Sequence, residues 1–447
     1  MSRRLLKQAM LKSRIEDRGA RIGIIGLGYI GLPLMLAATA KGYRVLGFDI
    51  DDSKVYGLNH GKTSLTHISE AEILAARKAN LFEATNELNR LAEVDIIVIC
   101  VPTPLGRYRE PDLSSVVRAT ESVASCLRAG NLAILESTSY PGTTSEIVRP
   151  ILETTGLKSG TDFYLAFSPE RVDPGNAEYP RSRIPKIVGA DDSASLGVAS
   201  AFYAALVDEV VSVSSSKAAE AVKLTENVFR AVNVALVNEL KIAYSKMGID
   251  IFEVIAAAKT KPFGYMPFYP GPGLGGHCIP VDPFYLTWKA REFNVDTPLI
   301  ELAGEINSEM PRYVVRRIAE ILDQKRGCAL SRANVLIVGV AYKRDVGDIR
   351  QSPALVIIEL LQERGAIVHY YDPLLQMIPE NREHPALAGM KSIVMDHNAV
   401  SKYDVVVIVT DHTDIDWIAL VEAAQLIVDT RNVCVRVEEG RHKVCLA

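Results

Sequence analysis

A strand, a glycine-rich turn, a helix and a second strand follow one another early in the chain, and this run constrains the fold more than any other. Residues 22–25 read as a buried strand, Gly26-Leu-Gly-Tyr-Ile-Gly31 as the turn, residues 32–41 as the helix and residues 44–48 as the next strand. The glycines permit the turn and the close approach of a pyrophosphate, which the helix N-terminus then faces. This order of elements predicts a Rossmann unit that binds a dinucleotide.

The carboxylate of Asp49 ends the second strand, where it can bond the adenosine ribose hydroxyls and would repel a 2′-phosphate. The unit therefore favours NAD over NADP. Lys54 is a further candidate for a phosphate contact, although a solvated lysine explains it equally well. The predicted cofactor contacts in this unit are Gly26, Gly28, Tyr29, Ile30, Gly31, Asp49 and Lys54.

Further apolar strands are expected at residues 94–101, 132–135 and 164–167. In a doubly wound sheet, ligands lie beyond the carboxyl ends of the strands. Thr103 and Thr138, which follow the first two strands, are therefore candidate cofactor contacts, with ordinary turn residues as the alternative. Glu170 follows the third strand, and from the residues alone it is a surface acid rather than a base.

A long helix is predicted over residues 216–246, which contain no Gly or Pro. Lys223 and Asn227 lie four residues apart on one face, where an ammonium and an amide could stabilise an oxyanion or could simply form an exposed polar strip. The many apolar residues of this helix suggest a connector that also packs against a second subunit. Residues 299–307 are expected to be helical, with Pro311 in the first turn of another helix over residues 312–325.

The βαβ pattern returns after a boundary at residues 327–332, with strands expected at residues 334–340, 367–371, 405–409 and 426–428 and a helix at residues 353–364. The full glycine fingerprint is missing here, so we expect a second Rossmann-like domain that holds another ligand. Its strand-end loops carry Lys343, Arg350 and Arg431, which suit a phosphorylated or nucleotide-linked substrate.

The predicted fold class is α/β, with two Rossmann-like parallel-sheet domains joined by a central long helix. The predicted division is an N-terminal extension over 1–20, an NAD-binding domain over 21–212, a helical dimerisation domain over 213–326 and a C-terminal Rossmann-like domain over 327–447. The basic N-terminal segment favours a solvated helical extension, with a subunit contact as the alternative.

A loop rich in Gly and Pro, residues 270–283, holds a single thiol, Cys278, and a single carboxylate, Asp282. Gly allows close approach to a ligand and Pro stiffens the loop, which suits an accessible nucleophile. A buried, inert cysteine is an equal alternative on chemistry alone, since Cys is among the most buried residue types.

Composition limits the partners of the chain. The net charge of −4 gives no indication of nucleic acid, and no apolar run reaches the ~20 residues of a membrane span. The six cysteines are scattered without paired metal spacing, so no metal site is expected, and sparse cysteine in a chain of 447 residues favours a reducing, cytoplasmic compartment.

Several motifs together resemble the UDP-glucose/GDP-mannose dehydrogenase family, over essentially the whole chain from Arg21. They are Gly26-Leu-Gly-Tyr-Ile-Gly-Leu-Pro33, Val101-Pro-Thr-Pro104, Ser168-Pro-Glu170, Lys223 with Asn227, Gly275-Gly-His-Cys-Ile-Pro-Val-Asp282, and Gly339-Val-Ala-Tyr-Lys343 through Arg350. The resemblance implies two successive NAD-dependent oxidations at C6 of a nucleotide sugar, from alcohol to carboxylate. The architecture implied is an NAD domain, a central helical dimerisation region and a C-terminal nucleotide-sugar domain.

The resemblance also implies roles for individual residues. Cys278 would attack the intermediate aldehyde, and the thioester formed after the second oxidation would be hydrolysed by water. Lys223 and Asn227 would stabilise the oxyanion, Asp282 would be an acid/base partner, and Glu170 would act near the hydrolytic water. Thr138 would lie by the nicotinamide. The implied catalytic and ligand-binding set beyond the glycine turn is Cys278, Lys223, Asn227, Asp282, Glu170, Arg171, Gly275, Lys343, Arg350 (cofactor) and Arg431.

Within the family, residues 262–273, 282–289 and 168–176 look like the UDP-N-acetylglucosamine 6-dehydrogenases, which supply surface-polysaccharide precursors. Val281 and Asp173 stand where the UDP-glucose enzymes carry Lys and a second Glu, which disfavours UDP-glucose and leaves a role for Asp173 open. The 2- and 4-epimers of the acetamido sugar, including UDP-N-acetylgalactosamine, remain alternatives. So do a single-step dehydrogenase of the hydroxyacid type and a catalytically inactive binding regulator.

Overall fold

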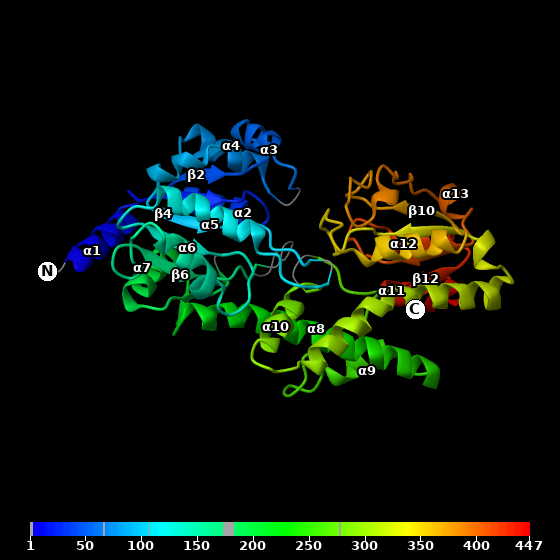
Figure 1. Ribbon diagram of the computed structural model, residues 1–447. Helices are drawn as coiled ribbons and strands as arrows, with labels where there is room; N and C mark the ends of the chain where they lie inside the picture. Colours follow the sequence, from blue (N-terminus) through cyan, green and yellow to red (C-terminus); the bar gives the residue numbers. More distant parts are fainter. Residues whose placement is uncertain (1–2, 66–67, 107, 173–182, 277–278) are drawn as a thin grey trace. The chain divides into compact units, whose positions relative to one another are not determined.

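The computed structural model describes residues 3–65, 68–106, 108–172, 183–276 and 279–447 (Figure 1). Contacts divide the chain into two compact units, one formed by residues 1–226 and 284–296 and the other by residues 227–283 and 297–447. Two helices, α8 (Ser216–Met247) and α10 (Asp282–Arg291), each contain a position at which the chain passes from one unit to the other. Each unit is built on its own sheet, and the predicted fold class is confirmed.

The first unit contains an eight-stranded sheet in the order β3-β2-β1-β4-β5-β6-β7-β8. Neighbours are parallel except β6 and β7, so the last two strands run against the others. Most of these strands are buried apolar runs, as expected for a sheet covered on both faces. The strands are β1 (Arg21–Ile25), β2 (Arg44–Phe48), β3 (Phe82–Thr85), β4 (Ile96–Ile99), β5 (Leu132–Leu135), β6 (Tyr164–Phe167), β7 (Lys186–Gly189) and β8 (Val210–Val213).

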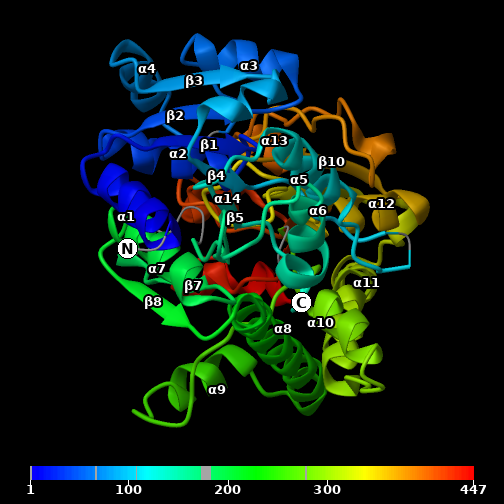
Figure 2. The same cartoon turned by 60° about the vertical axis from the view of Figure 1, so that its left-hand side comes forward.

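Helices cover both faces of this sheet, with α5 and α6 on the opposite side of the strands from α1 and α7 (Figure 2). The basic N-terminal helix is packed rather than solvated: Leu11 and Ile15 are buried, and the Tyr43 hydroxyl donates to the Ile15 carbonyl. The helices are α1 (Arg3–Glu16), α2 (Gly31–Ala40), α3 (Asp52–Asn59), α4 (Glu70–Lys78), α5 (Ser114–Cys126), a π-helical turn (Thr143–Val148), α6 (Arg149–Glu153) and α7 (Ser193–Ala204).

The second unit contains a parallel five-stranded sheet in the order β10-β9-β11-β12-β13. Its strands are β9 (Asn334–Val338), β10 (Ile367–Tyr371), β11 (Val405–Ile408), β12 (Ile427–Asp429) and β13 (Val444–Leu446). The accompanying helices are α9 (Ile251–Ala258), α11 (Pro298–Arg326), α12 (Pro353–Glu363), α13 (His397–Val400) and α14 (Trp417–Ala423). Helices α11 and α12 contribute to one buried apolar cluster with the strands.

Helix α11 differs from the prediction of two helices, because it continues through Pro311. A mid-helix proline removes one backbone hydrogen bond and normally costs about 3 kcal/mol. Here Met310, Pro311 and Val314 are all buried, so packing of this turn offsets the cost. The side chain of Asn307 also fastens the turn, donating to the Ala231 carbonyl at 2.9 Å and accepting from Asn238 at 3.0 Å.

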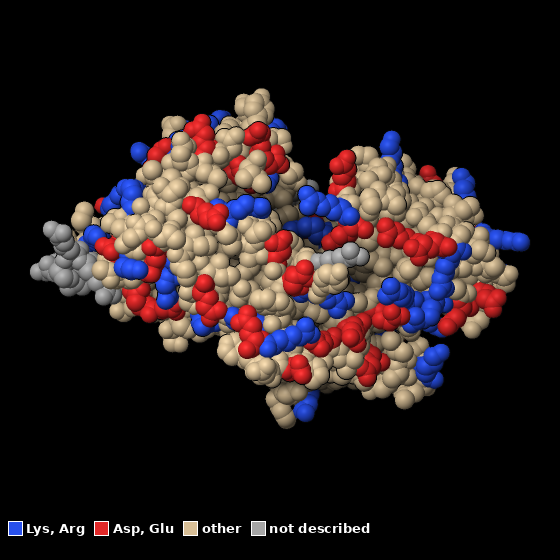
Figure 3. All heavy atoms as spheres, viewed as in Figure 1, with Lys and Arg blue, Asp and Glu red and all other residues tan. Residues whose placement is uncertain are grey.

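The surface of each unit carries mixed charge. Figure 3 shows basic and acidic side chains interspersed on the visible face of both units. Within the described ranges, no helix combines the length and the apolar character that crossing a membrane requires.

Candidate active site

The glycine turn after β1 has the geometry that a bound pyrophosphate requires. Gly26 has φ +94°, and a Cβ there would lie 2.6 Å from the Cys100 carbonyl oxygen. A Cβ on Gly31 would lie 1.9 Å from the Gly26 oxygen, so helix α2 can begin this close to the turn only with glycine. Gly28 faces open space, with no atom within 4 Å of an added Cβ. The turn is thus held by two glycines and leaves room for a ligand at the third.

Asp49 lies at the end of β2, and its carboxylate points back to this turn. It accepts the Leu27 backbone N–H at 3.0 Å and forms an ion pair with Lys54 at 2.8 Å. The Asp49 side chain is 7% exposed, so its charge sits at the edge of the turn, partly neutralised by the lysine. A glycine cradle, a helix N-terminus and an acidic strand end fit the diphosphate and ribose of NAD. When bound, NAD supplies the acceptor for a hydride.

The two predicted threonines follow neighbouring strands β4 and β5. Thr103 is 3% exposed, and its carbonyl accepts the Tyr285 hydroxyl at 3.0 Å. Thr138 is half-buried, close to the end of β5. Because the carboxyl ends of parallel strands share one edge of the sheet, both residues lie at the same edge as the glycine turn. The structure is consistent with this placement, and their contact with a cofactor stays a prediction.

Glu220 of α8 holds the segment after Thr138 in place. Its buried carboxylate accepts the Gly142 and Thr144 backbone N–H groups at 2.6 and 2.8 Å and the Thr144 hydroxyl at 2.7 Å. Burial raises the pKa of Glu220 to about 7, although these hydrogen bonds act in the opposite direction. Sequence reasoning missed this residue, since an acid on a helix gives no sign that it will be buried.

Glu170 and Lys223 meet in the first unit. The Lys223 ammonium, on α8, donates to the Glu170 backbone carbonyl at 2.7 Å. The Glu170 carboxylate accepts the backbone N–H groups of Arg171 and Val172, both at 2.8 Å. These two hydrogen bonds stabilise the start of the loop after β6. The guanidinium of Arg171 is bound to Glu226 at 2.6 Å. The predicted Arg171 thus has a local partner in α8.

Asn227 and Asp282 meet in the second unit. Asn227 lies on α8 and is 7% exposed; Asp282 begins α10 and is 1% exposed. The amide nitrogen of Asn227 donates to the Asp282 carboxylate at 2.5 Å. Asp282 is four residues beyond Cys278, so this bond fixes the C-terminal end of the cysteine loop. Cys278 itself and Asp173 lie outside the described residues.

The loop before Cys278 packs on the second sheet's own strand-end loops. A Cβ on Gly275 would lie 2.7 Å from the Tyr342 side chain, and the Gly276 N–H donates to the Arg350 carbonyl at 2.9 Å. Lys343 follows Tyr342 and is half-buried. The Arg350 guanidinium forms an ion pair with Asp348 at 2.8 Å. Gly275, Lys343 and Arg350 are therefore neighbours in one part of this unit.

Arg431 lies just after β12 and donates its Nε–H to the Val409 carbonyl at 2.8 Å. A Cβ on Gly271 would lie 2.7 Å from its guanidinium, so the cysteine loop also passes this residue. Burial lowers the pKa of Arg431 to about 10. The cation is still charged at neutral pH, which suits an anionic ligand.

In the second sheet, as in the first, an aspartate at a strand end accepts backbone N–H groups of a neighbouring turn. Asp372 lies just after β10 and accepts the Val340 and Ala341 N–H groups of the turn after β9, at 2.8 and 3.0 Å. His412 contacts the same carboxylate at 3.1 Å. Burial acts to raise the pKa of Asp372, but the hydrogen bonds of His412 and the backbone N–H groups outweigh it, so this pKa is lowered. Asp372 stood at a predicted strand end, but no motif indicated its pairing with His412.

Two Rossmann-type units, one of them with a glycine turn that fits NAD, define an NAD-dependent dehydrogenase. Three domain models of the UDP-glucose/GDP-mannose dehydrogenase family match the chain. The NAD binding domain matches residues 20–207, the central domain residues 217–309 and the UDP binding domain residues 336–436. The chain belongs to this family. It is an NAD-dependent nucleotide-sugar dehydrogenase, which confirms the predicted family, enzyme class and cofactor.

Two similar proteins carry different substrate names. The chain is 36% identical to a UDP-N-acetyl-D-glucosamine 6-dehydrogenase of Pseudomonas aeruginosa, covering 79% of this chain and 82% of that protein. It is 35% identical to a UDP-N-acetyl-D-mannosamine dehydrogenase of Pyrococcus horikoshii, covering 92% and 96%. A solved structure of the UDP-D-ManNAc dehydrogenase from that organism superposes with a TM-score of 0.82 at 33% identity, covering 92% of this chain and 95% of that one.

Proposed function

We propose that this chain oxidises the C6 hydroxymethyl group of a UDP-N-acetylhexosamine, with UDP-N-acetylglucosamine as the substrate, to the 6-carboxylate used for surface polysaccharides. The bond between Asn227 and the buried Asp282 carries the proposal. It holds an amide and a carboxylate next to the loop of Cys278, where a thiolate nucleophile needs groups that bind an oxyanion and move a proton. The cytoplasmic location stays a prediction.

In the proposed reaction Cys278 adds to the C6 aldehyde left by the first oxidation. Removal of the second hydride converts the resulting thiohemiacetal to a thioester, and water releases the carboxylate and the thiol. Lys223 and Asn227 hold the oxyanion, Asp282 accepts or returns the proton, and Glu170 orients the water. Overall, one alcohol and one water yield one carboxylate, with two hydrides transferred.

The test is the number of NADH molecules released per UDP-sugar consumed. Wild type should release two, and Cys278→Ser should lose carboxylate formation by a factor of about 1000 or more, because a weak nucleophile replaces the thiolate. Cys328→Ser, at a half-buried thiol after α11, is the control and should keep wild-type turnover. One NADH per sugar, or an active Cys278→Ser, would contradict the covalent mechanism. Binding of both ligands without turnover would favour an inactive regulator.

The epimer is a second question, because relatives bear both the glucosamine and the mannosamine name. UDP-N-acetylmannosamine is therefore the second candidate, supported by the greater share of the chain that the Pyrococcus relative covers. Values of kcat/KM for UDP-N-acetylglucosamine, its 2-epimer, UDP-N-acetylgalactosamine and UDP-glucose would rank the candidates. Near-equal use of UDP-glucose would refute N-acetyl specificity.

We also propose that the chain forms a homodimer through its central region. Several large apolar side chains of α8, the loop after α9 and the start of α11 are at least half exposed, and all belong to the second unit: Phe229, Leu236, Phe263, Met266, Leu299 and Leu302. Exposed apolar groups of this number are typical of a protein interface. A second copy of the chain is the occupant proposed for this apolar surface.

A further inference from the structure

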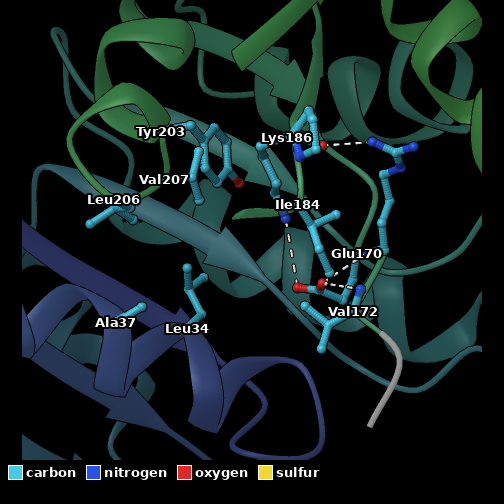
Figure 4. A pocket seen from close by; sticks show the side chains of 11 residues that line it. Leu34, Ala37, Glu170, Val172, Ile184, Lys186, Tyr203, Leu206 and Val207 are labelled. Carbon is cyan, nitrogen blue, oxygen red and sulfur yellow. Dashed lines mark hydrogen bonds and ion pairs between the residues drawn. The ribbon is translucent and has the colours of Figure 1, made fainter. Parts of the chain in front are cut away.

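A buried ionic cluster lies beneath the Glu170 loop and outside the residues that the motifs indicated. Its centre is Lys186, the first residue of β7, which is 6% exposed. The Lys186 ammonium lies 3.1 Å from the Glu136 carboxylate and 3.7 Å from the Glu170 carboxylate. Figure 4 shows Lys186 pointing towards Glu170 beside an apolar pocket lined by Leu34, Ile184 and Val207.

The base of this cluster is rigid. Glu136 follows β5 directly and is 1% exposed, and it accepts a hydrogen bond from the Tyr203 hydroxyl of α7. The Lys186 ammonium also lies over the Tyr203 ring, 5.0 Å from its centre. Strands β5 and β7 and helix α7 therefore fix the position of one cation. This cation faces Oε2 of Glu170, whereas the Arg171 and Val172 amides bind Oε1.

The cluster reaches the reacting groups through the backbone of the loop. The carboxylate of Glu170 is bound by Lys186 on one side and by the Arg171 and Val172 amides on the other, and its own carbonyl receives the Lys223 ammonium at 2.7 Å. The Arg171 N–H and the Glu170 carbonyl belong to one planar peptide group, so the carboxylate that binds this N–H also orients the carbonyl that receives Lys223. Lys186 and Lys223 are thus linked through Glu170.

We propose that Lys186 is a positioning residue, whose charge holds Glu170 and thereby sets Lys223 for oxyanion stabilisation; this rests on the function proposed above. A buried ion pair contributes little net stability, since desolvation offsets the attraction of the charges. An apolar pair of similar size at this place would serve stability equally well. The cluster therefore serves to position the catalytic groups, because a displacement of such a group by about 1 Å costs roughly 100-fold in rate.

The experiment compares three changes. Lys186→Met alone leaves Glu136 buried without its cation and would destabilise the fold. The double change Lys186→Met with Glu136→Gln removes both charges, and Lys186→Arg keeps the cation. The matched control is Lys289→Met, because the Lys289 side chain is equally buried at 7% exposure and is likewise shared between two carboxylates, Glu146 and Glu292.

We expect the double variant to lose about 10- to 100-fold in kcat with KM for NAD and UDP-sugar changed less than twofold. Lys186→Arg should restore at least a third of the wild-type kcat, and Lys289→Met should keep kcat. Wild-type kcat in the double variant would overturn the proposal, as would an equal loss in Lys289→Met at an equal fall in melting temperature.

Crystal structures of wild type and the double variant give a readout that needs no substrate. The proposal expects the contact between Lys223 Nζ and the Glu170 carbonyl to be lost, and an unchanged contact would overturn it. If wild type turned over no UDP-sugar, the proposed function would fail. The same two crystal structures would still decide whether Lys186 sets the position of Glu170 and Lys223.

Discussion

At the residue scale, Asp49 combines two functions that can be separated. Its carboxylate accepts the Leu27 N–H, and we propose that its charge also binds the adenosine ribose of NAD. Asp49→Asn keeps an oxygen for Leu27 but removes the charge. A charged hydrogen bond contributes about 1.5–3 kcal/mol, so KM for NAD should rise at least tenfold while the relative use of NADP increases.

Steady-state kinetics with both cofactors would check this prediction. Asp51→Asn is the control, because Asp51 caps α3 through the Ser53 and Lys54 N–H groups and Asn caps equally well. The control should keep both KM values. An Asp49→Asn enzyme with an unchanged preference for NAD would show that the carboxylate does not contact the ribose.

A second residue-scale prediction concerns Glu220, whose pKa is about 7 in the folded chain and has an ordinary value of 4.5. Between these two pH values the folded state holds a proton that the unfolded state has released. The contribution of Glu220 to stability is therefore present below pH 4.5 and is lost as pH rises to about 7, by roughly 3 kcal/mol in all.

Urea unfolding at pH 5 and pH 7.5 would measure this loss. Glu220→Gln should reduce the difference in unfolding free energy between the two pH values, whereas Glu121→Gln, at an exposed position of α5, should leave it as in wild type. If wild type and Glu220→Gln showed the same pH dependence, the buried carboxyl would not be its source.

At the element scale, two glycines at the start of α2 have different roles: we expect Gly31 to be required for folding and Gly28 for NAD binding. Gly31→Ala would force a Cβ to 1.9 Å from a backbone oxygen, and we expect a loss of at least 1–3 kcal/mol of stability. Gly28→Ala meets no atom within 4 Å and should unfold like wild type. It should nevertheless weaken NAD binding roughly tenfold, because the methyl group would crowd the pyrophosphate.

Thermal unfolding and calorimetric titration with NAD would test the pair together. Equal melting temperatures for Gly31→Ala and wild type would mean that the helix can move away from the turn. Unchanged NAD affinity in Gly28→Ala would place the pyrophosphate elsewhere.

Local patterns predicted most of the strands, because a strand that is buried on both faces is a continuous apolar run. β4 and β11 are fully buried runs of Ile and Val, and α2 follows its glycine turn as expected. Helix α11 was predicted as two because Pro311 normally interrupts a helix, and tertiary packing overrode that tendency. The strand β7 was not predicted, since it begins with Lys186, a residue type that rarely reads as buried.

The sequence indicated candidate residues for the site, but not the contacts between them. The strand-end rule and the motifs singled out Asp49, Glu170, Lys223 and Asn227. That Lys223 binds a backbone carbonyl, or that Glu136 and Lys186 support Glu170 from below, depends on residues brought together by the sheet. Such pairings involve separations of tens of residues and leave no local signal.

At the scale of the whole molecule, the apolar surface of the central region predicts the oligomeric state. Leu236→Glu places a charge in the middle of α8, on the surface proposed to contact a second copy, and should convert the dimer to monomer. The matched control is Val394→Glu, because Val394 is 81% exposed against 53% for Leu236 and lies outside that surface. Analytical ultracentrifugation of both variants would decide, and a dimeric Leu236→Glu chain would rule out this surface.

The acid at the end of the second strand has a consequence for redesign. Asp49 and Asp372 each follow the second strand of their sheet in chain order; Asp49 accepts one backbone N–H of the neighbouring turn and Asp372 accepts two. In the second sheet, whose turn lacks the full glycine fingerprint, the acid supports the turn through these hydrogen bonds. Replacing Asp49 with a residue that has no side-chain oxygen, in order to change the coenzyme preference, would therefore also remove the hydrogen bond that holds the glycine turn. A successful swap would need to leave an oxygen acceptor behind.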